Sequence, residues 1–207
     1  MTNNLRTCEV FFKADERNPT IKPQSKRLQV GFKRLSDCAV IPTKAHASDS
    51  GFDLVASEDV IIEPGETAVV PTGIAVELPA GYEAQVRPRS GVTAKTKLRV
   101  QLGTIDNGYN GEIGVIVDNI RTPIKTIDID GGWTGLSTVS SIDAYTVCGT
   151  GQYLGERTAD GTYLIRKGER IAQLVVQPLP DVEAIEVFDV EETERGEGGF
   201  GSSGVRG

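Results

Sequence analysis

A glycine-rich segment, residues 102–114, carries a carboxylate at Asp106 and an aromatic ring at Tyr109. A carboxylate in such a place can orient a water molecule and accept its proton, while the ring packs on a flat group such as a sugar. Asn-Gly pairs at 107–108 and 110–111 predict a hairpin with both side chains at its tip. An ordinary turn with a surface tyrosine would show the same residues, so this segment alone leaves two interpretations open.

A second segment, Pro88-Arg89-Ser90-Gly91, precedes the one plausible helix, a short one at residues 92–97. Backbone N–H groups at the start of a helix point toward a bound anion, and glycine lets the anion's oxygens come close. A serine hydroxyl and an arginine guanidinium add donors and a positive charge. The segment therefore has the composition of a phosphate cradle, although a serine N-cap beside a surface arginine also fits it.

The end of the chain, residues 194–204, sets Arg195 and Phe200 among glycines and serines. Glycine gives mobility, an aromatic ring can stack on a base, and arginine with serine can clamp a terminal phosphate. A Walker A loop is excluded, because no Gly-Lys-Ser/Thr follows. A flexible tail with incidental residues is the alternative interpretation.

Two smaller groups of polar residues complete the set that could do chemistry. Asp49 and Asp53 flank Gly51, and Arg170 and Gln173 lie at the start of a predicted strand. Taken singly, each group fits a solvated turn.

The composition assigns the chemistry to carboxylates. The 207 residues include a single histidine, His46, which excludes a histidine-rich zinc site and leaves acid-base chemistry to Asp and Glu. With 22 Lys plus Arg against 29 Asp plus Glu, the net charge of −7 argues against direct DNA binding. Any phosphate site must therefore be local.

Cysteine usage and hydropathy indicate the compartment. The three cysteines are far apart and form no C-x-x-C pair, which argues against disulfides and favours a reducing cytoplasm. No apolar run approaches the roughly 18 residues that cross a bilayer, and the polar start lacks the apolar centre of a signal peptide. We therefore expect a cytoplasmic protein without a membrane partner.

The elements that must position these residues are short strands. Helix-period apolar stripes are nearly absent, whereas β-branched runs bounded by Pro and Gly recur along the chain, which predicts an all-β sandwich or barrel. Strands are predicted at 60–62, 68–70, 74–78 and 82–86, and further ones at 28–32, 98–102, 112–117 and 171–177.

Composition also divides the chain. We expect a β-barrel core at 28–119 and 166–190, an N-terminal extension at 1–27, an inserted subdomain at 120–165 and a flexible glycine-rich arm at 191–207. The insert is rich in Gly, Ser and Thr and holds the one tryptophan, Trp133.

Taken in order, the polar segments resemble the five motifs of the trimeric dUTPase family. The matching stretches are Gly-Phe-Asp-Leu at 51–54, Pro-Arg-Ser-Gly at 88–91, Gly-Thr-Ile-Asp-x-x-Tyr-x-Gly-Glu at 103–112, Gly-Glu-Arg-Ile-Ala-Gln-Leu at 168–174 and Arg-Gly-x-Gly-Gly-Phe-Gly-Ser-Ser-Gly at 195–204. The resemblance covers residues 28–119 and 166–204. It implies a jelly-roll-like β-barrel subunit (β-clip type) in a homotrimer, with each active site assembled from three chains.

The activity that this resemblance implies is Mg²⁺-assisted hydrolysis of dUTP to dUMP and pyrophosphate, which keeps uracil out of DNA and supplies dUMP for thymidylate synthesis. Asp106 would activate the water that attacks the α-phosphorus, and Tyr109 would pack under the deoxyribose and exclude a 2′-hydroxyl. Gly103, Ile105 and Gly114 would bind the uracil, in a site too tight for the 5-methyl group of thymine.

The resemblance also implies roles for the remaining motif residues. Arg89, Ser90, Gly91 and Gln173 would hold the phosphates, and Asp53 would touch the Mg²⁺ through water, since Mg²⁺ keeps several of its waters. The arm would close over the nucleotide through Arg195, Phe200, Gly201, Ser202 and Ser203. The enzymatic alternative is the related dCTP deaminase, which shares the fold.

The 46 residues at 120–165 depart from the family pattern, because most members have a short turn there. Such an insert resembles those of dUTPases from phages of Gram-positive bacteria, some of which also bind repressor proteins. A regulatory binding surface with Trp133 as an anchor is therefore a second hypothesis, and a solvent-facing decoration is its alternative. Asp128 and Asp130 are weak grounds for a cation site.

Overall fold

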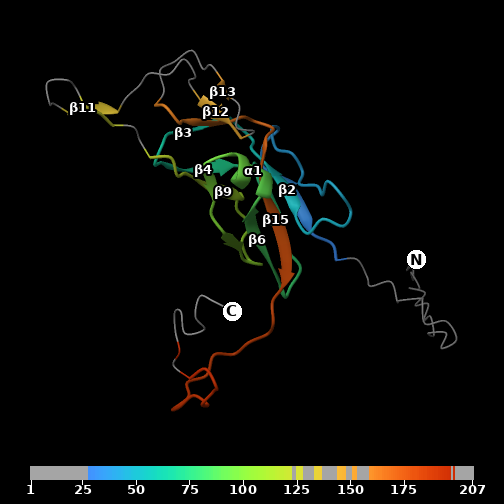
Figure 1. Ribbon diagram of the computed structural model, residues 1–207. Coiled ribbons are helices and arrows are strands. Elements are labelled where there is room, and N and C mark those ends of the chain that lie inside the picture. The colour runs from blue at the N-terminus through green and yellow to red at the C-terminus, as the bar shows by residue number, and fades with distance from the viewer. Residues whose placement is uncertain are drawn as a thin grey trace, which may run out of the picture.

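The computed structural model describes residues 28–122, 125–127, 133–136, 144–147, 151–152, 159–196 and 198. The elements are β1 (Gly31–Arg34), β2 (Phe52–Val55), β3 (Val60–Ile62), β4 (Thr67–Pro71), β5 (Ile74–Glu77), β6 (Tyr82–Pro88), α1 (Ser90–Lys95), β7 (Leu98–Val100), β8 (Gly103–Ile105), β9 (Gly114–Asn119), β10 (Lys125–Ile127), β11 (Trp133–Leu136), β12 (Ala144–Thr146), β13 (Gly151–Gln152), β14 (Tyr163–Ile165) and β15 (Arg170–Pro178). The predicted all-β class is confirmed (Figure 1).

Three sheets of three or four strands and one two-stranded sheet surround the core. Their strand orders are β2-β15-β6-β8, β4-β9-β7 and β13-β12-β14-β3, and β1 pairs separately with β5. The long strand β15 runs through the body of the molecule and pairs antiparallel with β2 on one side and β6 on the other (Figure 1). The predicted motif segments at 51–54 and 168–174 therefore lie on neighbouring strands of one sheet, and those at 88–91 and 103–112 begin on its other two strands.

The strands bury one face and expose the other, as period-2 alternation requires. On β9, Val115 and Val117 are buried while Ile116 is exposed, and on β4, Val70 is buried while Val69 is exposed. Val69 and Ile116 are direct cross-strand partners. The outer face of the β4-β9-β7 sheet thus presents a pair of apolar side chains to solvent.

The Pro-Gly turns that predicted the strand ends have the expected backbone. Gly73, between β4 and β5, adopts a φ of +66°, and an added Cβ would lie 2.7 Å from the Ser36 hydroxyl oxygen. Glycine meets both requirements, because it alone adopts positive φ at little cost and has no side chain to collide.

The predicted hairpin at 102–114 is wrong. Strand β8 pairs with β6, whereas β9 pairs with β4 and β7, so residues 106–113 connect two sheets. The reason is that the Asn107 side-chain amide donates to the backbone oxygens of Leu78 and Pro79, each at 2.8 Å. These bonds hold the loop against the β5–β6 connection instead of closing it on itself.

Other boundaries differ by a few residues, and three strands of the core and the four strands β10 to β13 were not expected. Strand β1 begins at Gly31 instead of 28, and α1 begins at Ser90 instead of 92. The unexpected core strands are β2, β8 and β14. All three residues of β14 are buried, and β14 pairs antiparallel with β3.

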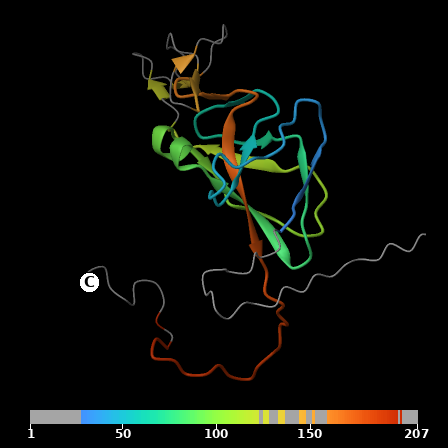
Figure 2. The ribbon, with the colours of Figure 1, turned by 90° about the vertical axis from the view of Figure 1, so that its right-hand side faces the viewer.

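Beyond β15 the chain leaves the body of strands as a segment, residues 179–196, that ends in a turn at 193–196 (Figures 1 and 2). It exposes Val182, Ile185 and Phe188 almost completely. No helix in the described part of the chain has the length and apolar character needed to span a membrane.

Candidate active site

Asp106 follows β8 directly and begins a loop that the core holds in place. Besides the Asn107 contacts, the backbone N–H of Gly73 donates to the Glu112 carboxylate at 2.6 Å. The Thr72 hydroxyl, which is fully buried, donates to the backbone oxygen of Ile113 at 2.7 Å. The loop is therefore fixed at its start and at its end, and Asp106 is placed by the core.

The loop presents Asp106 and Tyr109 to solvent. Asp106 is exposed, and its carboxylate makes no hydrogen bond or ion pair with another described residue. The Tyr109 hydroxyl donates to the backbone oxygen of Glu112 at 2.9 Å, which orients the ring across Gly111. An acceptor carboxylate and an oriented aromatic face thus stand side by side on a rigid support.

These residues line one small pocket of about 230 Å³. The predicted residues that the structure brings together there are Gly103, Ile105, Asp106, Tyr109 and Gly114. Gly103 and Gly114 begin β8 and β9, so backbone groups of two different sheets border the pocket. Exposed Ile116 lies at its edge.

A second and larger pocket, of about 660 Å³, surrounds the start of α1. The predicted residues that line it are Asp53, Arg89, Ser90, Gly91 and Gln173. The serine-cap interpretation is wrong, because the N-cap residue is Arg89 and no side chain caps the helix. The Ser90 hydroxyl is not used for capping, and a Cβ added to Gly91 would meet no atom within 4 Å. The helix start faces open space.

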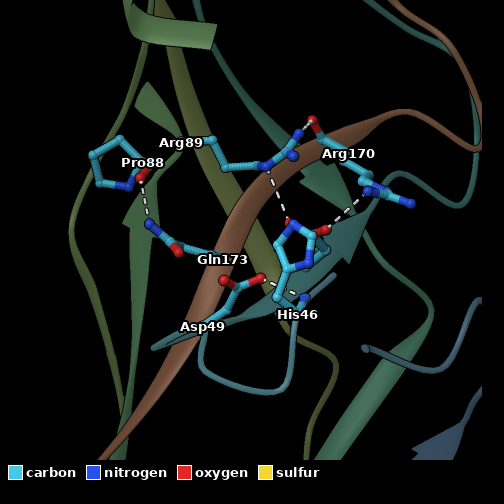
Figure 3. Close-up of polar contacts among 7 residues, drawn as sticks. His46, Asp49, Pro88, Arg89, Arg170 and Gln173 are labelled. Atoms are coloured by element: carbon cyan, nitrogen blue, oxygen red, sulfur yellow. Dashed lines mark hydrogen bonds and ion pairs between the residues drawn. The ribbon is translucent and has the colours of Figure 1, made fainter. Parts of the chain in front are cut away.

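Asp53 fixes the two arginines of this pocket. Its carboxylate pairs with Arg89 at 3.0 Å and with Arg170 at 3.2 Å, and its side chain is only 16% exposed. Arg89 also donates to the backbone oxygen of Arg170 at 3.0 Å, and Gln173 donates to that of Pro88 at 3.0 Å (Figure 3). Donors from Arg89, between β6 and α1, and from Arg170 and Gln173 of β15 are thereby held around a single space.

The turn before β15 is also held by ionic contacts. The backbone N–H of Lys167 and the guanidinium of Arg166 both donate to Asp59 at 2.8 Å, and they hold the pKa of that carboxyl below its ordinary value. The contact of the Lys167 ammonium with the Cys38 sulfur at 2.8 Å raises the pKa of the lysine. Strand β15 therefore begins from an ordered turn, with Arg170 at its first position.

Sequence reasoning missed part of the charge in this pocket. Arg87 and Lys95 also line it, so that four cationic residues, with Arg89 and Arg170, face the carboxylates of Asp49 and Asp53. Lys95 lies four residues after Gly91, a spacing that places both on one helix face and could have identified it. The pocket is locally cationic in an acidic chain, as a local phosphate site requires.

The structure does not bring all predicted site residues together. The Asp106 pocket and the α1 pocket have no lining residue in common. Arg195 lies on the segment beyond β15 and donates to the backbone oxygen of Gly198 at 2.9 Å. Phe200, Gly201, Ser202 and Ser203 lie outside the described residues.

An all-β subunit with a cationic anion pocket and a separate carboxylate pocket bordered by glycine backbone has the parts of a nucleotide hydrolase. Its sequence matches the dUTPase family model over residues 37–131 and 158–204, and the chain belongs to the dUTPase family. Its fold is accordingly the jelly-roll type of that family.

Proteins of similar sequence match this chain over nearly their whole length. The deoxyuridine 5′-triphosphate nucleotidohydrolase of Gloeothece citriformis is 38% identical over 83% of this chain and 94% of its own. The dUTPase of Staphylococcus bacteriophage 80alpha with bound dUpNHpp has a TM-score of 0.73 and 37% identity over 86% of this chain and 99% of its own. That protein is described as controlling the transfer of virulence genes.

A second phage structure is also similar. The dUTPase of Staphylococcus aureus phage phi11 has a TM-score of 0.68 and 30% identity over 80% of this chain and 99% of its own, and it is noted for a species-specific insert. A variant of the phi11 enzyme is described with a structural Mg(II) ion.

Proposed function

We propose that the chain hydrolyses dUTP to dUMP and pyrophosphate. The observation that carries the proposal is the exposed Asp106 carboxylate beside Tyr109 in a pocket bordered by the backbone of Gly103 and Gly114. The similarity to a dUTPase with bound dUpNHpp supports the same substrate. We place this reaction in the cytoplasm of a bacterial or phage-infected cell, where it keeps uracil out of DNA.

In this mechanism Asp106 acts as the general base. Its carboxylate accepts a proton from a water molecule as the water oxygen bonds to the α-phosphorus. The bond between the α-phosphorus and the oxygen that bridges to the β-phosphate breaks, and pyrophosphate leaves. The role suits a group that no described side chain neutralises or covers.

The same pocket accounts for nucleoside selection. The ring of Tyr109, held by its bond to Glu112, packs under the deoxyribose and leaves no room for a 2′-hydroxyl. Backbone groups beside Gly103, Ile105 and Gly114 bind the uracil edge, and the small volume rejects the 5-methyl group of thymine. Exclusion by collision discriminates more strongly than loss of one apolar contact, which is worth about 1–3 kcal/mol.

The pocket at α1 holds the phosphates. Arg89, Ser90, Gly91 and Gln173 supply donors there. In the described part of the chain no three His, Cys, Asp or Glu side chains form a ready-made metal site, and both Asp53 oxygens pair with arginines. This donor set fits Mg²⁺ held mainly by substrate phosphates and reached by Asp53 through water. The ion, when bound, neutralises charge on the triphosphate.

We propose that the complete site forms in a homotrimer. One chain holds its base pocket and its phosphate pocket apart, so a second copy must bring one pocket to the other. Exposed Ile116 lines the base pocket, and its cross-strand partner Val69 is exposed beside it, where such a copy would bury both. The segment 179–196, with its exposed Val182, Ile185 and Phe188, would carry the arm of one chain to a neighbour.

Replacing Val69 and Ile116 together by lysine is expected to give monomers with at least about 10²-fold lower kcat/KM, because small misplacements of reacting groups cost that much. Sedimentation and dUTP turnover measure the two effects. Ile61→Lys, at an apolar residue of similar exposure on β3, is the control and should leave both unchanged. A fully active trimer from the double variant would rule out this interface.

The reaction itself is tested by hydrolysis of dUTP in ¹⁸O-labelled water. Attack at the α-phosphorus places the label in dUMP and leaves the pyrophosphate unlabelled. Release of ammonia from dCTP would instead identify a dCTP deaminase, the alternative with the same fold.

A second candidate function, regulation of a partner protein through the insert, is favoured by the similarity to the phage 80alpha dUTPase. We propose that residues 120–165 contain the contact surface for a repressor-type partner. Trp133 begins β11. Among the described strands, β11 pairs with β10 alone. We also propose that the chain divides into a β-barrel core (28–119 and 166–190), the insert (120–165), an N-terminal extension (1–27) and a C-terminal arm (191–207).

Excision of residues 123–158, closed by a short glycine turn, tests this second function. The deletion keeps 159–165, because Tyr163, Leu164 and Ile165 are buried against β3. We expect the shortened chain to keep hydrolysing dUTP, with a KM raised by the loss of the pocket residue Val147, but to lose the capacity to induce SaPI elements, for which the phage 80 relative is described. Unchanged induction would show that the insert is not the contact surface.

A further inference from the structure

One strand of the insert belongs to a core sheet. Strand β12 pairs in parallel with β14, with Tyr145 opposite Tyr163, and β14 pairs with β3. In Figure 1 β12 and β3 lie together at one end of the molecule, next to α1. The insert is therefore attached through β12 and β14 to the sheet that contains β3, whereas β10 and β11 form a separate two-stranded sheet.

A cluster of one cation and two rings fixes this attachment. The Arg121 guanidinium lies 4.6 Å from the ring centre of Tyr145 and 5.5 Å from that of Tyr163. The two rings lie 5.8 Å apart, and Arg121 donates to the Tyr163 hydroxyl at 3.4 Å. Stacking of this kind holds the side chains in one geometry.

Residues at the two ends of the insert also form hydrogen bonds with the chain just after α1. The backbone N–H of Lys97 donates to the Tyr163 hydroxyl at 2.9 Å, and its backbone oxygen accepts from the N–H of Ile120 at 3.0 Å. Lys97 comes two residues after the last residue of α1. Both polypeptide ends of the insert thus hold the helix that carries Ser90 and Gly91.

Val147 extends the insert into the pocket itself. It directly follows β12, is 8% exposed and belongs to the same buried apolar cluster as Val92 of α1. It lines the phosphate pocket together with Ser90, Gly91 and Lys95. Within residues 123–158, as far as the structure describes them, no other residue lines that pocket.

We propose that Val147 is a positioning residue for triphosphate binding, through which the insert forms part of the phosphate pocket and holds α1 in place. The inference rests on the proposed function and adds to it, because it makes the insert a working part of this chain's own phosphate site. An insert that only decorates the surface would have no residue in that wall.

The sign of an introduced charge tests the placement. Val147→Asp and Val147→Lys place charges of opposite sign at the same position. Because the cationic residues of the pocket would pair with the Asp and repel the Lys, structural damage alone would weaken the Lys variant more, and Tm is measured for both. Against a triphosphate, the carboxylate repels and the ammonium attracts. We expect Val147→Asp to bind dUpNHpp at least about tenfold more weakly than Val147→Lys, with a much smaller difference for dUMP. Equal binding by the two variants would overturn the inference.

A milder series covers the case in which the charged variants do not fold. Val147→Thr is expected to raise KM for dUTP about three- to tenfold with kcat nearly unchanged. Val147→Ile, which keeps an apolar side chain at this position, is expected to keep KM close to the wild-type value. Val100→Thr is the matched control: Val100 has similar burial in the same cluster but lines neither pocket, so its substitution lowers Tm and leaves KM unchanged. An unchanged KM in Val147→Thr would overturn the inference.

Measurements on the wild-type chain distinguish failure of the proposed function from failure of the role of Val147. If it binds no dUpNHpp and hydrolyses no dUTP, the proposed function and this inference fail together. If it does both while the Val147 variants behave like the Val100 control, the inference alone fails.

Discussion

Replacement of Asp106 by asparagine is expected to lower kcat for dUTP by about 10²–10⁴-fold, the range that general-base catalysis contributes. Asparagine has nearly the same shape but cannot accept a proton. The loop that carries residue 106 is held by Asn107, Thr72 and Glu112, and none of these contacts uses the Asp106 carboxylate. The pocket should therefore keep its geometry, and the Kd for dUpNHpp should change little.

Steady-state turnover and calorimetric binding measure the two quantities in parallel. Asp37→Asn, at an exposed carboxylate outside both pockets, is the matched control and should behave as wild type. Hydrolysis by Asp106→Asn at the parental rate would remove Asp106 from the mechanism. Loss of binding and turnover together would instead indicate a positioning role.

Deletion of residues 195–207 is expected to reduce kcat/KM by about 10²–10³-fold, because the arm supplies donors and excludes water only when it closes. Arg195 and Phe200 are removed, while the segment beyond β15 stays through Glu194. The apolar side chains of that segment, which we propose contact a neighbouring subunit, are retained, so the trimer should persist.

A shorter deletion, of residues 205–207 alone, removes the end of the chain but keeps the whole motif, and should cost little activity. Phe200→Ala should lie between the two deletions, because stacking of one base is worth about 1–3 kcal/mol. Sedimentation monitors the oligomer and dUTP turnover monitors catalysis. Undiminished turnover by the chain without residues 195–207 would contradict the proposed role of the arm. Dissociation of that shortened chain to monomers would also contradict it.

Much of the fold could be predicted from local sequence, because its strands end at Pro-Gly turns. The strands that were missed form through partners far away in the chain. Strand β14 is buried by pairing with β3, about a hundred residues earlier, and its own surroundings are rich in glycine and threonine. Strand β2 contains the polar Asp53 and is held by β15. The local pattern of apolar and polar residues does not reveal which distant strands will pair.

The site, like the fold, could be predicted from the sequence only in part. The residue types of both pockets were predicted from the motifs, since Asp106, Tyr109 and the Arg89–Gly91 segment are contiguous in sequence. The separation of the two pockets in one chain, the ion pairs of Asp53 with Arg89 and Arg170, and the place of Val147 depend on how sheets meet. Those features required the structure.

Turnover of five nucleotides by the 207-residue chain tests the proposed dUTPase activity and its selectivity. Pyrophosphate release from dUTP, dTTP, dCTP, dATP and UTP is compared at equal concentration with Mg²⁺ present. We predict hydrolysis of dUTP, with dTTP rejected by its 5-methyl group and UTP by its 2′-hydroxyl. Comparable pyrophosphate release from dTTP or UTP would contradict the proposed nucleoside selection, and none from dUTP would contradict the proposed reaction.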